Sequence, residues 1–146
     1  RPVPMKRPAR KRAVAQPAAG RQRGPERGLF IRRKWIDLIL KGKKSWELRS
    51  MPTNIRGRFA LIEGTADRRK GEKPRLVGEV TLKDCVKIAT WAEGCQRWSY
   101  KPGVSVRNTF SKHRATAADL RKFNWASLYA WVLKDPVMYA KPRPVK

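Results

Sequence analysis

Apolar and polar residues follow a helical period in one short stretch of this chain and a strand period in several others. Residues 35–41 place apolar side chains at i, i+3 and i+4, and Gly42 follows as a helix-ending residue. Residues 29–32 precede them as a short apolar run, and from 44 to 49 the period changes to two. The pattern predicts a strand, a helix and a second strand in this order.

Three further strands are predicted downstream. Residues 58–63 form an apolar run, and residues 76–88 alternate, with Gly78 marking a bulge or a close approach. Residues 129–133 form another strand, followed by a turn at Asp135 and Pro136 and a short strand toward Tyr139.

The connecting segments contain fewer regular signals. Residues 65–74 are charged and contain glycine, which predicts a projecting loop. Residues 116–119 resemble a capping box that begins a second helix, whereas residues 90–105 are predicted only as irregular or partly helical. Five or six mostly antiparallel strands with two short helices predict a mainly β (α+β) fold, a small barrel with a helix at its mouth.

Charge divides the chain into an extension and a domain. The 146 residues carry a net charge of +25, and counting along the sequence assigns +8 to residues 1–28 and +17 to residues 29–146. The first segment is rich in proline and arginine and has few apolar residues, which predicts an extended basic tail. Since the domain is basic as well, we expect a polyanionic partner, and no apolar run is long enough to span a membrane.

The basic tail leaves three interpretations open. The run KRPARKR is typical of a nuclear signal, the segment also fits the remnant of an organellar targeting peptide, and it could thread between RNA phosphates. A sequence that begins at Arg1 suits a processed precursor or an incomplete N-terminus. We expect an intracellular ribonucleoprotein particle, with a mitochondrial ribosome favoured over a cytoplasmic or nucleolar location.

Cys85 and Cys95 have no other metal-ligand types nearby, and His113 is the single histidine. We therefore expect two reduced thiols, no metal and no cofactor. His113, in the run KHR, is expected at the surface or facing RNA rather than acting as a base.

The segment GKKSWELR, residues 42–49, contains the candidate site. A helix-to-strand junction would bring Lys44, Glu47 and Arg49 to one face of the sheet, where they could hold a phosphate, a base edge or a reacting carbonyl. The alternative is that this charged face is the solvated side of an antiparallel strand.

The same segment fits the GxKxxExR signature of ASCH domains, which belong to the PUA-like superfamily. The chain resembles this family over residues 30–146, through the ordered blocks KWIDLILKGKKSWELR, RGRFALIE, LVGEVTLKDC and YAWVLKDPVMYAKPRPVK. The resemblance implies a pocket for RNA or a nucleotide-like ligand at the barrel mouth, with Lys44, Glu47 and Arg49 as its floor and Arg56 and Arg58 beside it. Family members usually continue into a last strand, so either the chain is truncated or a partner covers the open edge.

Some ASCH-like proteins are amidohydrolases that deacetylate acetylated cytidine, using a lysine, a threonine and a later glutamate. Lys44 matches the lysine, but Glu47 stands where the threonine would be, and the residues after His113 contain no glutamate at the expected place. Amide hydrolysis needs an activated nucleophile and a proton shuttle, so we expect binding without turnover. The alternative is a nucleoside- or RNA-acting enzyme with Lys44 and Glu47 as catalytic residues.

The function expected from the sequence is therefore non-catalytic RNA binding as a structural subunit of a large ribonucleoprotein such as a ribosome. The partners would be RNA, rRNA in particular, and neighbouring proteins of the particle, and we expect neither a membrane partner nor a homo-oligomer. The cations expected to contact RNA phosphates are Arg7, Arg10, Lys11, Arg12, Arg21, Arg23, Arg32, Arg33, Lys41, Lys43, Arg68, Arg69 and Lys70.

Overall fold

The structure, a computed structural model, describes residues 25–64 and 69–145. In chain order the elements are β1 (Gly28–Ile31), α1 (Arg33–Leu40), β2 (Trp46–Arg49), β3 (Gly57–Glu63), β4 (Arg75–Ala92), the short 3-10 helix η2 (Glu93–Cys95), β5 (Arg97–Tyr100), α2 (Val106–His113), α3 (Ala117–Arg121) and β6 (Ser127–Pro144). The described chain is a mixed six-stranded sheet with three short α-helices. The predicted mainly β, α+β fold is confirmed.

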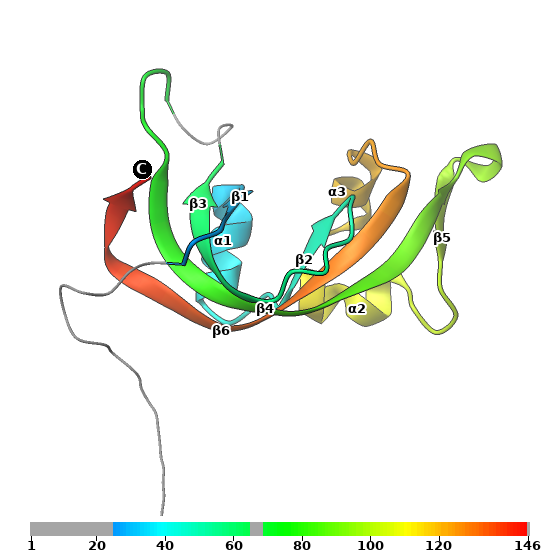
Figure 1. The fold of residues 1–146 in the computed structure, drawn as a ribbon. Helices are drawn as coiled ribbons and strands as arrows, with labels where there is room; N and C mark the ends of the chain where they lie inside the picture. Colours follow the sequence, from blue (N-terminus) through cyan, green and yellow to red (C-terminus); the bar gives the residue numbers. More distant parts are fainter. Residues whose placement is uncertain (1–24, 65–68, 146) are drawn as a thin grey trace, which may run out of the picture.

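The two longest strands, β4 and β6, form the frame of the domain. They pair antiparallel, and their register shifts at four places, between Leu76 and Gly78 for example. Bulges bend a strand and increase its twist, and Figure 1 shows β4 and β6 curving together into one arch. The elements β1, β3 and α1 lie at one end of this arch, and β2, β5, α2 and α3 lie at the other.

The turn predicted at Asp135 and Pro136 is wrong, because β6 continues through both residues to Pro144. Asp135 has a φ of +52°, and the pairing with β4 is irregular between Lys134 and Val137. A bulge and a turn use similar residue types, and here the neighbouring strand β4 keeps the chain extended.

The order of strands in the sheet leaves β1 and β2 at its two ends. The hydrogen-bonded path runs β1-β3-β4-β6-β2, with β5 joined to the outer part of β4. β1 runs parallel to β3, and the other described pairs are antiparallel. Since the sheet is curved, the two end strands approach each other, and the Arg49 guanidinium of β2 donates a hydrogen bond to the Phe30 carbonyl of β1 at 3.2 Å.

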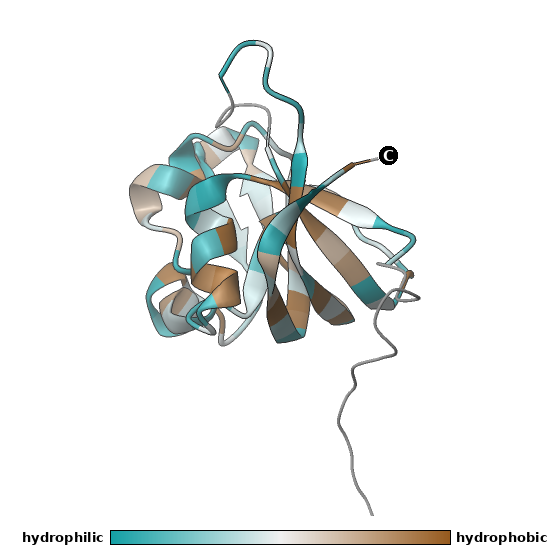
Figure 2. Ribbon diagram, turned by 90° about the vertical axis from the view of Figure 1, so that its left-hand side faces the viewer, coloured by the Kyte–Doolittle hydropathy of each residue, from teal (hydrophilic) through white to brown (hydrophobic). Residues whose placement is uncertain are grey.

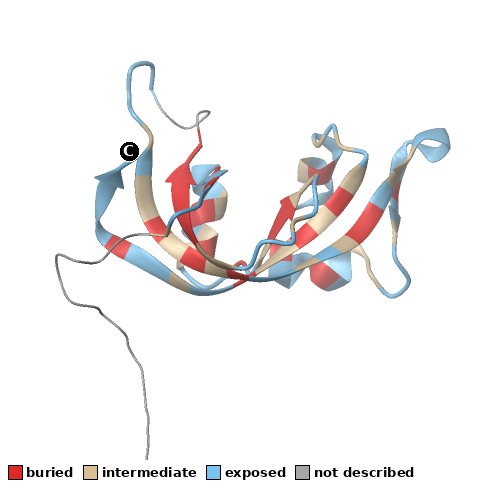
Figure 3. Cartoon of the chain, in the orientation of Figure 1, coloured by how far each residue is buried: buried red, intermediate tan, exposed pale blue. Residues whose placement is uncertain are grey.

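Two hydrophobic clusters stabilise the two ends of the arch. The first packs α1 against β1, β3 and β4, and the second packs β2, β5, α2 and α3 against the other half of β4 and β6. Figures 2 and 3 show apolar and buried positions concentrated on the strands and on the inner faces of the helices. Trp35 of α1 packs against both clusters and therefore lies at their junction.

Gly78 provides the close approach that its position in a strand predicts. A Cβ built at this residue would lie 2.5 Å from the Val137 carbonyl oxygen and 2.7 Å from a Leu40 methyl group. The register of β4 against β6 also shifts beside it. Glycine therefore lets α1 pack directly on the sheet at this point.

The region predicted as irregular is more regular than expected. β4 extends to Ala92, η2 turns the chain, and β5 returns alongside β4 with Trp91 opposite Trp98. α2 then begins at a capping box made by Ser105 and Asn108, which was not predicted. The predicted helix after Thr116 is present as α3, with the Thr116 capping box.

Two further predictions concern residues that lie wholly or partly outside the described ranges. The loop at residues 65–74 is described only from Arg69 onward, and most of the predicted tail, residues 1–28, lies outside the described residues. In the described ranges, no helix has the length and apolar character needed to cross a bilayer.

Candidate functional site

Gly42 turns the chain from α1 toward the site. It has a φ of +76°, its N–H donates to the Ile39 carbonyl, and the Lys43 N–H donates to the Leu38 carbonyl at 2.8 Å. These two bonds form a Schellman motif, which satisfies the last carbonyls of a helix. The following residue, Lys44, is thereby directed into the space between the two hydrophobic clusters.

The Lys44 ammonium group is buried and donates its hydrogen bonds within the protein. The residue is 4% exposed, and its Nζ donates to the Trp46 and His113 carbonyls at 2.7 Å each. The His113 carbonyl belongs to the last turn of α2, where carbonyls lack helical partners and positive charge is favourable. The Ser45 N–H donates to the neighbouring Lys112 carbonyl at 2.9 Å. Lys44 and Ser45 thus cap α2 from another part of the chain.

The expectation that His113 lies at the surface is wrong, because the residue is 1% exposed. Its Nδ1 accepts from the Ala115 N–H at 2.9 Å, so the ring proton is on Nε2, which donates to the Thr109 hydroxyl at 3.0 Å. Burial first, and then the charge of Lys44, lower the pKa of His113 to about 4. His113 is a neutral structural group that fixes the loop after α2.

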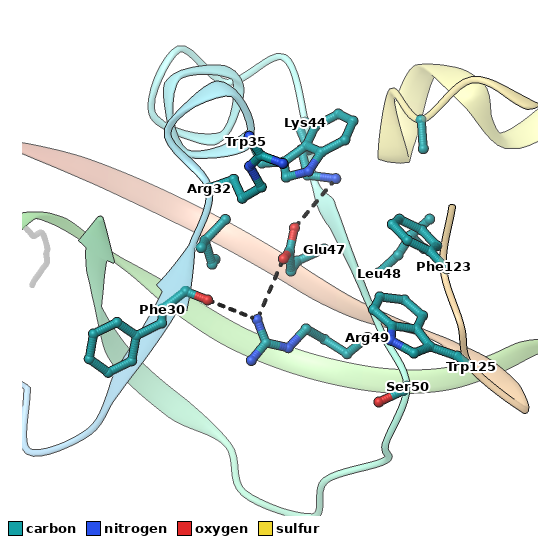
Figure 4. Close-up of a pocket in the computed structure, with 12 residues that line it drawn as sticks. Phe30, Arg32, Trp35, Lys44, Glu47, Leu48, Arg49, Ser50, Phe123 and Trp125 are labelled. Atoms are coloured by element: carbon teal, nitrogen blue, oxygen red, sulfur yellow. Dashed lines mark hydrogen bonds and ion pairs between the residues drawn. The ribbon is translucent and has the colours of Figure 1, made fainter. Parts of the chain in front are cut away.

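Glu47 and Arg49 lie on the inner face of β2. The Glu47 carboxylate is 6% exposed, with Lys44 Nζ 3.6 Å from one oxygen and the Arg49 guanidinium 3.6 Å from the other (Figure 4). The alternative of a solvated strand face is therefore wrong for Glu47. Burial raises the pKa of Glu47, opposed by the charges of Lys44 and Arg49, and burial lowers the pKa of Lys44, opposed by Glu47.

The Glu47 carboxylate retains unused hydrogen-bond capacity. Both cation distances are longer than a charge-assisted hydrogen bond, and no other described residue donates to its oxygens. A buried carboxylate has room for several donors. The arrangement can therefore bind a group that presents N–H or O–H donors.

A cavity of about 280 Å³ opens in front of this carboxylate, here called the Glu47 pocket. It is lined by residues 30–32 and Trp35 at β1 and α1, by Lys44 and residues 47–50 at β2, and by Ala115, Phe123 and Trp125. Figure 4 shows the ring of Trp35 above Glu47 and those of Phe123 and Trp125 at the opposite side. The pocket therefore combines a charged floor with aromatic walls.

The structure brings together some of the predicted site residues and separates others. Lys44, Glu47 and Arg49 meet in the pocket, but neither Arg56 nor Arg58 lines it. Arg58 bonds Glu79 and Thr81 and the Asp135 carbonyl on the sheet. Arg56 donates to carbonyls of its own loop and lies 3.6 Å from Asp84.

The predicted phosphate contacts are also distributed unevenly. Arg32 lines the Glu47 pocket, and Arg33 is bound to buried Glu63 at 2.8 Å. Exposed positions away from the pocket are held by Lys41, Lys43, Arg69 and Lys70. The remaining predicted contacts lie outside the described residues: Arg7, Arg10, Lys11, Arg12, Arg21, Arg23 and Arg68.

The aromatic walls of the pocket were missed from the sequence. Trp35 lies on the predicted apolar helix face, and it both packs on the two clusters and lines the pocket, with Lys44 Nζ 4.7 Å from its ring centroid. Phe123 and Trp125 stack with centroids 4.1 Å apart in the connection between α3 and β6. The position of the FNW sequence in a connection offered only a general signal, since loops often carry binding residues, and both rings also pack against the second cluster.

The cysteines take no part in this site. Cys85 is half-buried, Cys95 is exposed, and both are free. Among the described residues, no group of three His, Cys, Asp or Glu side chains could hold a metal ion.

The curved mixed sheet, the short helices and the pocket at the helix-to-strand junction define a small α+β domain of the PUA-like type. The model of the ASCH domain family matches residues 29–142, so the chain belongs to the ASCH domain family. Membership of this family indicates an RNA-binding or RNA-related function in general. A search among curated proteins found no match.

Proposed function

We propose that this protein binds single-stranded RNA, takes one base into the Glu47 pocket and does not turn it over. The observation that carries the proposal is the buried Glu47 carboxylate, which faces a cavity with aromatic walls and has unused acceptor capacity. Bases that leave the helical stack are recognised by aromatic stacking and by hydrogen bonds at their edges. A carboxylate selects edges that carry N–H donors.

The size of the pocket supports a small flat ligand. Its volume of about 280 Å³ lies just below the range of small-molecule sites, roughly 300–1,000 Å³. Arg49, at the rim, is partly exposed and can reach a phosphate, while Glu47 lies deeper. A base would therefore enter toward Glu47 and leave its backbone near the arginine.

The bonding of Lys44 supports binding without catalysis. Its ammonium group donates hydrogen bonds to two backbone carbonyls and lies 3.6 Å from the Glu47 carboxylate, so these donors are occupied before any ligand binds. A catalytic lysine needs a free amine or a mobile proton. We therefore assign Lys44 a positioning role rather than a catalytic one.

The charge of the chain supports a place inside a ribonucleoprotein. The net charge of +25 includes +17 outside the first 28 residues, by count along the sequence, so the domain is basic as well as the tail. Proteins embedded in folded RNA contact phosphates from several directions. Within this proposal rRNA is the partner, and an organellar ribosome is the particle we favour.

RNA binding through the Glu47 pocket is tested by fluorescence anisotropy with a labelled single-stranded RNA. With about 6–10 phosphate contacts, affinity should fall roughly 1,000-fold or more between 50 and 200 mM salt. Glu47→Gln should weaken binding about tenfold or more, because hydrogen bonds to charged groups contribute roughly 1.5–3 kcal/mol. Glu26→Gln, at an exposed position, removes the same charge and is the matched control.

Arg49→Gln and Arg56→Gln form a second matched pair, because each removes one cation and only Arg49 lines the pocket. A greater loss for Arg49→Gln supports the pocket, whereas equal losses show that binding depends on charge alone. Binding that does not respond to salt would overturn the proposal entirely.

Turnover is tested separately with acetylated cytidine and a structured RNA. The wild-type protein should release neither acetate nor RNA fragments above the level of Glu47→Gln. Measurable turnover that Glu47→Gln abolishes would contradict non-catalytic binding and establish the enzyme alternative.

Membership of a particle is tested by sedimentation of cell extracts. The protein should comigrate with ribosomal subunits in low salt, and RNase treatment should release it. Sedimentation as a free protein under these conditions would contradict the ribonucleoprotein assignment and leave the pocket proposal intact.

A further inference from the structure

A second cavity lies beside the Glu47 pocket. It is here called the Trp91 pocket and has a volume of about 580 Å³. Trp91, Glu93 and Gln96 line one side, from the end of β4 and the η2 turn, and residues 121–126 line the other. Figure 1 shows the β4–β5 hairpin standing next to α3 and the start of β6 at this end of the arch.

The two cavities share a wall. Phe123 and Trp125 line both of them, and their rings are stacked with centroids 4.1 Å apart and an interplanar angle of 17°. A ligand in one cavity and a ligand in the other would therefore contact the same pair of rings. Two consecutive units of one linear polymer could therefore occupy the two cavities.

The chemistry of the Trp91 pocket suits a nucleotide. Trp91 provides an aromatic surface, and its ring is held edge-on against Trp98 at 5.3 Å. Arg121 and Lys122 are exposed at the rim, and neither side chain has an ion-pair or hydrogen-bond partner among the described residues. Unpaired cations beside an aromatic surface are the combination that binds single-stranded nucleic acid.

The polar groups of the pocket are compatible with this occupant. Asn124 offers an amide donor and acceptor that no other described residue uses, and Gln96 adds a second amide at the opposite side. Glu93 is an exposed acid at the η2 turn, and it can accept from a base amino group while repelling a phosphate. The phosphate is therefore expected on the Arg121 and Lys122 side.

We propose that the Trp91 pocket binds the nucleotide adjacent to the one in the Glu47 pocket, so that the stacked Phe123–Trp125 pair separates two consecutive bases of a single strand. This inference rests on the proposed RNA binding and adds a second subsite to it. A neighbouring base in its own aromatic pocket makes the dinucleotide, not the mononucleotide, the minimal tight ligand. A duplex, whose bases are stacked and paired, cannot occupy both pockets.

The experiment compares nucleoside 5′-monophosphates, dinucleotides and a single-stranded hexanucleotide, using quenching of tryptophan fluorescence. Stacking contributes about 1–3 kcal/mol per base, so the best dinucleotide should bind roughly 5- to 150-fold more tightly than the best mononucleotide. The double variant Arg121→Gln with Lys122→Gln should lose most of this gain. Its affinity for the mononucleotide should stay within about twofold of wild type.

Two controls separate the second subsite from general charge and from misfolding. Lys83→Gln with Lys134→Gln removes the same charge at exposed positions outside both pockets, and it should keep the dinucleotide gain. Asn124→Ala removes no charge and should weaken only the dinucleotide. Thermal unfolding monitored by circular dichroism should be unchanged in all three variants.

The outcomes distinguish this inference from the proposal on which it rests. If mononucleotides and dinucleotides bind equally, or both double variants lose the gain equally, the second subsite is refuted while RNA binding stands. If the wild-type protein binds none of the probes, both proposals fail.

Discussion

Lys44→Met should destabilise the domain strongly although it removes no apolar contact. Methionine keeps an unbranched chain of similar length beside Trp35 and deletes the ammonium group. The deletion leaves the Trp46 and His113 carbonyls without their donor, at present 2.7 Å away, inside a site where Lys44 is 4% exposed. It also leaves the Glu47 carboxylate buried with one cation instead of two.

The magnitude follows from these losses. Breaking a buried ion pair by removing one partner costs about 3–5 kcal/mol, and each hydrogen bond from a charged donor contributes about 1.5–3 kcal/mol. The ion-pair cost and the hydrogen-bond cost overlap, so they do not add in full. The energy needed to dehydrate Lys44 is also recovered when its charge is removed, which offsets part of the loss. We therefore expect a loss of about 3–5 kcal/mol, which for a domain of this size lowers Tm by roughly 10–20 °C.

The assay is urea and thermal denaturation followed by circular dichroism, applied to Lys44→Met, Glu47→Gln and the double variant. Neutralising Glu47 should recover part of the loss, with a coupling energy of about 0.5–3 kcal/mol, because the uncompensated carboxylate is then absent. A Tm for Lys44→Met within two degrees of wild type would refute the reasoning, since the amine would then be a ligand-binding group and not a structural one.

Three further predictions concern single positions. Gly42→Ala should cost about 1–2 kcal/mol in urea denaturation, since φ is +76° there; an unchanged midpoint would argue against the Schellman motif. Gly78→Ala should cost more, about 2–4 kcal/mol, because its Cβ would meet the Val137 carbonyl and Leu40; the exposed Gly94, whose Cβ would meet nothing, is the control position for the same substitution. The pKa of His113 is lowered from 6.5 to about 4, so as the pH falls the unfolded chain binds the proton before the folded protein does. The stability present above pH 6.5 should therefore be lost as the pH falls toward 4. The loss should be at most about 3 kcal/mol. His113→Phe should lack this slope when denaturation midpoints are measured against pH, and an identical slope in both proteins would show that another group titrates.

The strand–helix–strand start of the domain could be predicted because its signals are local. The helical spacing in α1, the glycine after it and the alternation in β2 act within a few residues of each other. The turn predicted at Asp135 was wrong because its outcome depends on a contact far away in the sequence. Whether such residues form a turn or a bulge depends on the strand alongside, and β4 lies some fifty residues earlier in the sequence.

The candidate site was predicted in part. The spacing of Lys44, Glu47 and Arg49 correctly indicated that they meet, since period two places the last two on one face of β2. Their burial was not predictable, because the covering groups come from β1, from α1 and from the connection between α3 and β6. The bond from Lys44 to the His113 carbonyl joins residues 69 positions apart, so no local pattern predicts it.

By itself, the sequence determined the basic charge, the mainly β character, the end of α1, the start of α3 and the charged trio at the junction of α1 and β2. Each of these depends on composition or on contacts a few residues apart, which operate in any fold. Only the tertiary structure decided that Glu47 is buried, that Lys44 caps α2 and that Phe123 and Trp125 stand between two cavities. The physical reason is that solvent exclusion and long-range hydrogen bonds arise when the curved sheet brings its end strands and distant connections together.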